Sequence, residues 1–187
     1  MALTTLDPTP ALVVIDLQKG ITAVPAVHPT EEIVTRSASL ANTFRRHGLP
    51  VVLVNVAGTA PGRTDRGRSD FTPPPGWTDL VDELDPQPDD HLVTKHRRSA
   101  FAGTSLHDRL QDLGVTQVVL TGISTTAGVE STARAAYDLG YHVVLATDAM
   151  TDRDADAHQN SITRIFPKLG ETATTDEILA KLAQTQS

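Results

Sequence analysis

Ala11-Leu12-Val13-Val14-Ile15 is a continuous apolar run that ends at Asp16, and other parts of the chain repeat its pattern. Similar short runs occupy residues 51–54, 117–120 and 142–146, and residues 91–94 form a further candidate. Short runs rich in β-branched residues, without polar alternation, are typical of strands that are buried on both faces. The repeated pattern therefore predicts a parallel β-sheet.

Helical patterns separate these runs. Thr30 is the expected N-cap of the first helix, with Glu31 and Glu32 in its first turn, where the helix dipole favours carboxylates. Gly48 ends that helix. Further helices are expected at 104–113, 129–139, 155–165 and 175–183, the last of them capped by Thr174 or Thr175. Alternating strands and helices predict an α/β fold.

Composition limits the possible functions. A length of 187 residues corresponds to one domain, residues 1–187. The chain has no cysteine, which excludes disulfides, zinc–thiolate sites and a cysteine nucleophile. The net charge of -7 argues against nucleic-acid binding. Because no apolar run is long enough to span a membrane and no signal peptide is evident, we expect a cytoplasmic protein that does not bind membranes.

Polar residues follow three of the expected strands. Asp16 follows the first run, Lys95 follows residues 91–94, and the Gly/Ser/Thr-rich segment 122–128 leads from the third run into a helix. Singly, these features have plainer interpretations as a turn residue, a solvated lysine and a capped turn. Ligands of open α/β sheets bind at the carboxyl ends of the strands. A carboxylate, an ammonium group and a helix N-terminus that meet there can hold a polar or anionic substrate.

The remaining polar and aromatic features lie near residues 63–76, a segment that glycine and proline predict to be an irregular loop. Basic residues cluster in this loop at Arg63, Arg66 and Arg68, and again in His96-Arg97-Arg98. Each cluster is either solvated or binds an anionic ligand. Phe71 and Trp77 border the loop and form either a pocket wall or part of the core.

The ordered set of motifs resembles the isochorismatase-like hydrolases, also called the cysteine hydrolase superfamily, from Leu12 to about Ile178. The resemblance implies a three-layer sandwich in which helices flank a central, mostly parallel sheet. The family's catalytic Asp and Lys correspond to Asp16 and Lys95, and Gly128 occupies the position of its cysteine. The motifs are Val14-Ile15-Asp16-Leu17-Gln18, Lys95-His96-Arg97-Arg98-Ser99-Ala100-Phe101-Ala102-Gly103-Thr104, and Thr121-Gly122-Ile123-Ser124-Thr125 through Gly128-Val129-Glu130-Ser131-Thr132-Ala133-Arg134.

Glycine in place of cysteine excludes the family's usual acyl-enzyme. True isochorismatases are similar in carrying glycine there, and they hydrolyse a vinyl ether after protonation by a carboxylic acid. The resemblance therefore favours Asp16 as a general acid, assisted by Lys95. Burial would raise the pKa of Asp16 and Lys95 would lower it, and the sequence leaves this balance open. The alternatives are an amide hydrolase that uses Asp-activated water and a catalytically inactive, ligand-binding member of the family.

The resemblance also implies a cis peptide bond between Ile123 and Ser124, with the Ala127 and Gly128 amides available to an anion. The histidines lack metal-ligand spacing, so we expect no metal site and no cofactor. Family members usually form homodimers or homotetramers, and the expected partner is a small-molecule substrate. Besides the catalytic positions, the expected substrate contacts are Gln18, Ser124, Thr125, Ala127, His96, Phe71 and Trp77.

Overall fold

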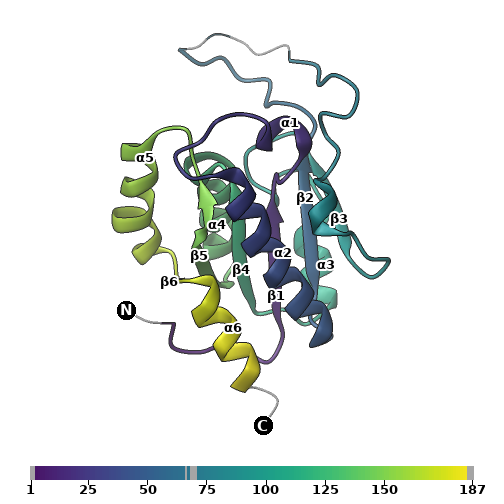
Figure 1. Ribbon diagram of the computed structural model, residues 1–187, viewed down its shortest axis with the longest axis vertical. Helices are drawn as coiled ribbons and strands as arrows, with labels where there is room; N and C mark the ends of the chain where they lie inside the picture. The colour runs from purple at the N-terminus through teal and green to yellow at the C-terminus, as the bar shows by residue number, and fades with distance from the viewer. Residues whose placement is uncertain (1–2, 66, 68–70, 185–187) are drawn as a thin grey trace.

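A computed structural model describes residues 3–65, 67 and 71–184. They form a six-stranded sheet in the order β3-β2-β1-β4-β5-β6, and every strand pair is parallel (Figure 1). None of the helices in this described part of the chain is long and apolar enough to cross a membrane. The strands are β1 (Pro10–Ile15), β2 (Val51–Val56), β3 (His91–Lys95), β4 (Gln117–Ile123), β5 (His142–Thr151) and β6 (Glu171–Ala173).

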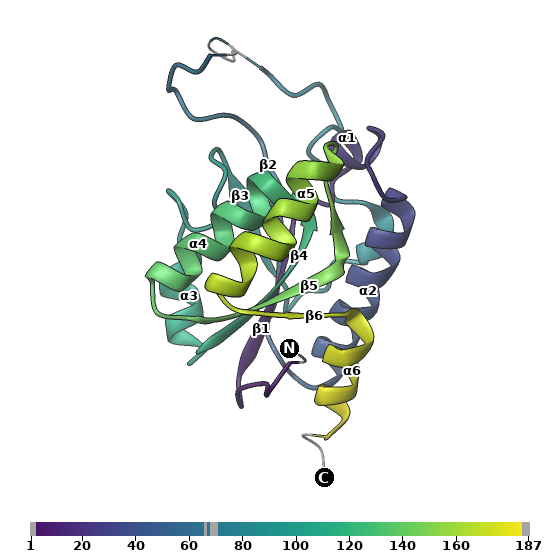
Figure 2. The same cartoon turned by 90° about the vertical axis from the view of Figure 1, so that its left-hand side faces the viewer.

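Helices cover both faces of the sheet, as Figure 2 shows. On one face lie α2 (Thr30–Arg46) and α6 (Thr175–Gln184), and on the other lie α3 (Leu106–Asp112), α4 (Glu130–Asp138) and α5 (Ala155–Asn160). The short elements are α1 (Lys19–Thr22), the 3₁₀ turns η1 (Asp82–Leu84) and η4 (Phe166–Lys168), and the π-helical turns η2 (Thr125–Val129) and η3 (Ser161–Ile165). The predicted three-layer α/β fold is thus confirmed.

Strand β1 shows why a continuous apolar run is needed at the centre of this sheet. All six of its residues are buried. Leu12 and Val14 belong to the apolar cluster on the α2 side, whereas Val13 and Ile15 belong to the cluster on the α3 side. Because successive side chains point to opposite faces, a strand covered on both sides cannot alternate with polar residues.

The strand predictions missed one element and ended too early in four others, most of all in β4 and β5. Strand β6 has only three residues, of which only Ala173 is buried, so it offers no apolar run. Strands β4 and β5 continue beyond the apolar stretches to Ile123 and Thr151, with a register irregularity between them. These extensions carry the chain to the end of the sheet where Asp16 lies.

Several helix boundaries also differ from the predictions. Thr30 is not the N-cap of α2, because Pro29 holds that position and the Thr30 hydroxyl donates to the Thr22 carbonyl. Helix α3 begins at Leu106, since the Thr104 hydroxyl donates back to a preceding carbonyl, that of Ala100. The helix expected at 155–165 is divided into α5 and the π-helical turn η3.

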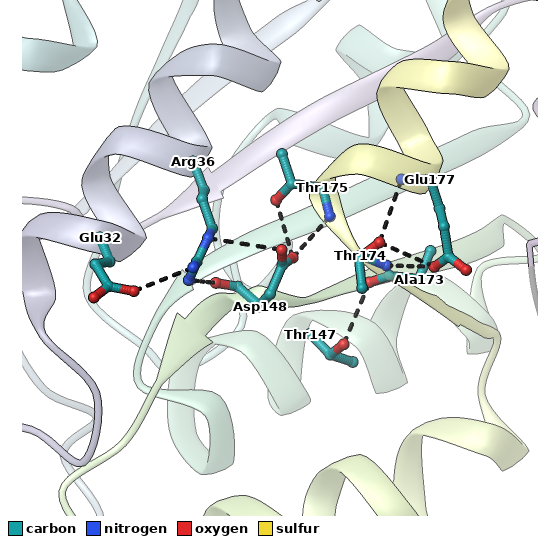
Figure 3. Close-up of polar contacts among 8 residues, drawn as sticks. All are labelled: Glu32, Arg36, Thr147, Asp148, Ala173, Thr174, Thr175 and Glu177. Carbon is teal, nitrogen blue, oxygen red and sulfur yellow. Dashed lines mark hydrogen bonds and ion pairs between the residues drawn. The ribbon is translucent and has the colours of Figure 1, made fainter.

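The N-terminus of α6 is tied to the rest of the molecule by a polar cluster (Figure 3). Thr174 and Glu177 form a reciprocal cap, in which the Thr174 amide donates to Glu177 Oε2 and the Glu177 amide donates to Thr174 Oγ1. Asp148 of β5 accepts hydrogen bonds from the amide and the hydroxyl of Thr175. Arg36 of α2 donates to the Asp148 carbonyl at 2.8 Å. One residue, Asp148, therefore joins two helices to one strand, α6 through its carboxylate and α2 through its carbonyl.

Candidate active site

Asp16 and Lys95 meet at the carboxyl ends of β1 and β3, across the end of β2. Lys95 Nζ lies 2.7 Å from Asp16 Oδ2 and also donates to the Arg97 carbonyl at 3.2 Å. The side chains of Lys95 and Asp16 are only 2% and 6% exposed. Asp16 has a positive φ of 54°, which Asp tolerates better than most residues, and its amide still donates to Val54 of β2. The pair is therefore a buried ion pair held by two strand ends.

Burial dominates the electrostatics of this pair. Desolvation raises the pKa of Asp16 from 3.8 to about 6, against the opposing charge and hydrogen bond of Lys95. Asp16 Oδ1 is buried and has no hydrogen-bond partner in the described structure. A carboxylate with one unsatisfied oxygen is costly to ionise in a low-dielectric site, which explains the direction of the shift. The balance that the sequence left open thus favours the neutral acid more than in an ordinary aspartate.

Gly128 places bare backbone directly against the ion pair. A Cβ at this position would lie 2.8 Å from Ile15 Cγ2, 3.1 Å from Asp16 Oδ2 and 3.7 Å from Lys95 Nζ. The first two distances are shorter than ordinary van der Waals contact. Nearby, Gly122 has a φ of 120°, and a Cβ there would collide with the Ile15 carbonyl. Two glycines therefore allow β4 and the turn after it to approach β1 closely.

A cavity of about 660 Å³ opens above this pair, a size suited to a small molecule. Asp16 is the only acidic residue among its described lining residues, which also include the cations Lys95, Arg97 and Arg98. The remaining described lining residues come from α1, the segment after β2 and the turn after β4. They are Ile21, Val56, Gly58, Thr59, Ala60, Gly62, Thr64, Gly67, Ile123, Ser124, Ala127 and Gly128.

Comparison with known proteins places this site in a family. The isochorismatase domain matches residues 10–177. The chain belongs to the isochorismatase family. Family members include hydrolases such as the streptothricin hydrolase of Streptomyces noursei, which is 34% identical over 148 residues, covering 79% of this chain and 51% of that protein. This isochorismatase-family chain is likewise a hydrolase.

Two further relatives match along almost their whole length. The uncharacterized isochorismatase family protein YwoC of Bacillus subtilis (strain 168) is 38% identical over 181 residues, covering 92% of this chain and 93% of YwoC. The structure of an isochorismatase family protein from Burkholderia thailandensis is 44% identical and superposes with a TM-score of 0.92, covering 96% of this chain and 98% of the other. Sequence and fold thus agree on the family.

The structure brings six of the expected site residues of this isochorismatase-family protein to the cavity wall: Asp16, Lys95, Ile123, Ser124, Ala127 and Gly128. The peptide bond between Ile123 and Ser124 is cis. The Ala127 amide, however, already donates to the Ser124 carbonyl at 3.1 Å, so it is not free for an anion as expected.

The other expected contacts lie elsewhere. Gln18 is fully buried, and its side-chain amide bonds to the Val56 backbone and to the Trp77 carbonyl. It therefore connects loops rather than contacting a ligand. His96 is exposed and lies beside Gly58. Phe71 and Trp77 contact each other edge to face at 5.0 Å, and the Trp77 ring packs on Gly20.

Thr125 is also directed away from the cavity, into a buried polar network. Its hydroxyl shares a 2.9 Å hydrogen bond with Nδ1 of His158, a residue that sequence reasoning missed. The next residue, Thr126, donates its amide and its hydroxyl to Asp152 at 2.8 and 2.7 Å. The turn that forms one wall of the cavity is thus anchored from behind by β5 and α5.

The sequence left the basic cluster His96-Arg97-Arg98 as either solvated or anion-binding, and His96 was the histidine expected at the pocket. Arg97 and Arg98, and not His96, line the cavity. Arg63 is exposed and is not one of the described lining residues, while Arg66 and Arg68 lie outside the described residues. Within the described chain, no three acidic or histidine side chains converge as a metal site requires.

Proposed function

We propose that this isochorismatase-family protein hydrolyses a vinyl ether of a small polar or anionic metabolite, with Asp16 as general acid and without a covalent intermediate. The observation that carries the proposal is the environment of Asp16, a buried carboxylate with a pKa of about 6 facing the bare backbone of Gly128. A general acid acts best when its pKa lies near the working pH. The cations Arg97 and Arg98 at the cavity wall favour an anionic substrate.

The reaction needs one proton and one water molecule. Asp16 gives its proton to the terminal vinyl carbon, while a lone pair of the ether oxygen forms the C=O⁺ bond of an oxocarbenium ion. Water then adds to the oxocarbenium carbon, which is bonded to the ether oxygen, and the added water returns a proton to Asp16. The resulting hemiketal collapses to an alcohol and a ketone, with cleavage of the ether bond. No step requires a nucleophilic side chain, which agrees with glycine at position 128.

Lys95 stabilises the carboxylate that remains after Asp16 has given up its proton. An ammonium group has three N–H donors. Two of them are engaged by Asp16 Oδ2 and by the Arg97 carbonyl. The third is available to a substrate oxygen, since Lys95 lines the cavity. In the proposed reaction, Lys95 therefore stabilises the Asp16 carboxylate and also donates a hydrogen bond to the substrate.

The nearest arrangement to a nucleophile and base is Thr125 with His158. Their hydrogen bond of 2.9 Å resembles that of a hydroxyl activated by an imidazole. Thr125 is fully buried, however, and is not one of the residues that line the cavity. This position supports hydrolysis by water rather than attack by Thr125.

An amide hydrolase that uses Asp16 as a base is the second candidate. With a pKa of about 6, roughly nine in ten Asp16 side chains are ionised at pH 7, which is the form that a base requires. The pH dependence of kcat/KM, which reports the pKa of the free enzyme, separates the candidates. Above pH 6, acid catalysis loses about tenfold in kcat/KM per pH unit, whereas base catalysis gains activity as pH rises to 6 and then levels off.

The experiment is an assay of purified protein against vinyl ethers, amides and ureides, followed by a pH profile on any substrate found. Turnover of a vinyl ether that declines above pH 6 supports the proposal. Turnover of amides alone, with the opposite profile, supports the base mechanism. No turnover, combined with a ligand that raises Tm, identifies a ligand-binding protein and overturns the proposal.

A further inference from the structure

We propose that His158 is a positioning residue that, through the Thr125 hydroxyl, fixes the 124–128 turn against the Asp16–Lys95 pair. His158 is 5% exposed and lies on α5, whereas Thr125 begins η2. The 124–128 turn lies between His158 and the cavity, and its residues Ser124, Ala127 and Gly128 line the cavity. His158 touches none of the cavity, so its effect on the site passes through the turn.

Three contacts from behind the turn support this assignment. The first is the 2.9 Å hydrogen bond between Thr125 and His158, and the second is the pair of hydrogen bonds from Thr126 to Asp152. The third is a ring contact of 4.9 Å between His158 and His28, whose amide and Nδ1 bond to Thr151. The histidine is therefore packed between the turn after β4 and the loop before α2, which restricts its rotamer.

The charge state of His158 suits a fixed role. Burial, with a smaller contribution from His28, lowers the pKa of His158 below its ordinary value, although Asp152 opposes this. His28 and Asp152 are the titratable groups that face it. A neutral imidazole offers one donor and one acceptor nitrogen, either of which pairs with a hydroxyl. Because an imidazolium keeps a donor at Nδ1, the hydrogen bond to Thr125 does not depend on which charge state is populated.

The position of the turn matters because Gly128 packs so closely on Asp16 that an added Cβ would lie 3.1 Å from Oδ2. If the turn moves outward, water reaches the Asp16 carboxyl and the desolvation that raises its pKa decreases. Lys95 is the charged group that faces Asp16, and it remains in place in every variant below. Loss of the His158 contact should therefore change the titration of Asp16, whereas loss of a remote contact should change only stability.

The test follows the Asp16 carboxyl ¹³C resonance through a pH titration, with its signal assigned from Asp16→Asn. We expect the wild-type midpoint near 6, and a lower midpoint in both His158→Ala and Thr125→Val. The double variant should have the same midpoint as each single variant, because the two substitutions remove the same hydrogen bond. His158→Asn, which keeps a polar atom at the position of Nδ1, should restore the wild-type midpoint.

The matched control is His107→Ala. His107 Nδ1 also makes a 2.9 Å hydrogen bond to a hydroxyl, that of Tyr141, away from the cavity. This variant should lose stability and keep the wild-type midpoint. A wild-type midpoint in folded His158→Ala, or an equal shift in His107→Ala, overturns the assignment. If His158→Ala does not fold, Thr125→Val decides, and failure of both to fold also overturns it.

The inference rests on the proposed role of Asp16, but its measurement does not. The titration reports the surroundings of one carboxyl group and requires no substrate. Absence of vinyl-ether turnover with a normal response of the variants would reject the proposed reaction alone. An unresponsive Asp16 in an active enzyme would reject the role of His158 alone.

Discussion

Two aspartates of the central sheet, Asp16 just after β1 and Asp148 within β5, have opposite environments. Asp148 is 30% exposed and has several partners, with Thr175 donating twice to Oδ1 and Arg36 lying 3.7 Å from Oδ2 (Figure 3). Asp16 is 6% exposed, has one charged partner and keeps one oxygen unpaired. The partly exposed Asp148 carboxylate, with partners on both oxygens, joins elements of the fold. A buried carboxylate with an unpaired oxygen has a raised pKa, because its charged form is destabilised, and a raised pKa is what a general acid requires.

The strongest test of this contrast removes each charge in turn. Asp16→Asn should reduce kcat by about 10²–10⁴-fold on a vinyl-ether substrate, since an amide cannot supply the proton. Asp148→Asn should leave kcat unchanged and lower only the thermal midpoint, because Asn still accepts from Thr175. Both are measured by steady-state kinetics and circular dichroism. Full activity in Asp16→Asn would disprove the acid role.

Removal of the cation at each site should also give unequal results. Lys95→Met leaves Asp16 buried without its partner, a change that costs about 3–5 kcal/mol when the remaining charge stays ionised. Because Lys95 lowers the pKa of Asp16, that pKa should rise above 6 in the variant. Denaturant unfolding at several pH values provides the measurement.

The sign of the pH effect follows from the direction of the shift. Asp16 binds its proton more tightly in the folded than in the unfolded chain, so its contribution to the unfolding free energy is present below pH 3.8 and is lost as pH rises through about 6. In Lys95→Met this loss should continue to higher pH. Arg36→Met, on the 38% exposed partner of Asp148, should cost at most about 1 kcal/mol at any pH.

Close packing of backbone against Asp16 predicts a further difference. Gly128→Ala should destabilise the protein by about 1–3 kcal/mol and reduce kcat, because its Cβ crowds Ile15 and Asp16. Gly62→Ala is the matched control, since no atom lies within 4 Å of the added Cβ. Equal Tm values for the two variants would show that the turn yields to a side chain. In that case, Gly128→Cys becomes a practical test for gain of amidase activity.

The smallest effect is expected on the Asp148 side. Thr175→Val removes one hydroxyl donor and keeps the amide donor, so we expect a loss of about 1 kcal/mol in the unfolding free energy. The kcat of this variant should equal that of the wild type. A reduced kcat would show that the cluster in Figure 3 is coupled to the site and would weaken the contrast drawn above.

The sequence predicted best those strands whose composition is determined by burial alone. Continuous apolar runs predicted β1, β2, β4 and β5, because burial on both faces leaves no place for polar residues. Strand β6 carries no such run. Asp16 directly follows β1 and Lys95 is the last residue of β3, so the parallel topology brings both to the same end of the sheet.

Side-chain direction at the site depends on geometry that the sequence does not specify. Ser124 faces the cavity and Thr125 faces His158, a division set by an irregular π-helical turn rather than by a regular period. His158 follows Thr125 by 33 residues, and no motif connects the two. Gln18 lies close to Asp16 along the chain, yet its bonds to Val56 and Trp77 direct it into the loops.

The strand order has a consequence for how the catalytic apparatus is assembled. From β1 the chain adds β2 and β3 toward one edge of the sheet, then returns and adds β4, β5 and β6 toward the other. Asp16 and Lys95 come from the first winding, and the glycine turn that packs against them comes from the second. Neither half of the sheet contains the whole site, so activity requires that both halves are folded and packed together on the shared strand β1.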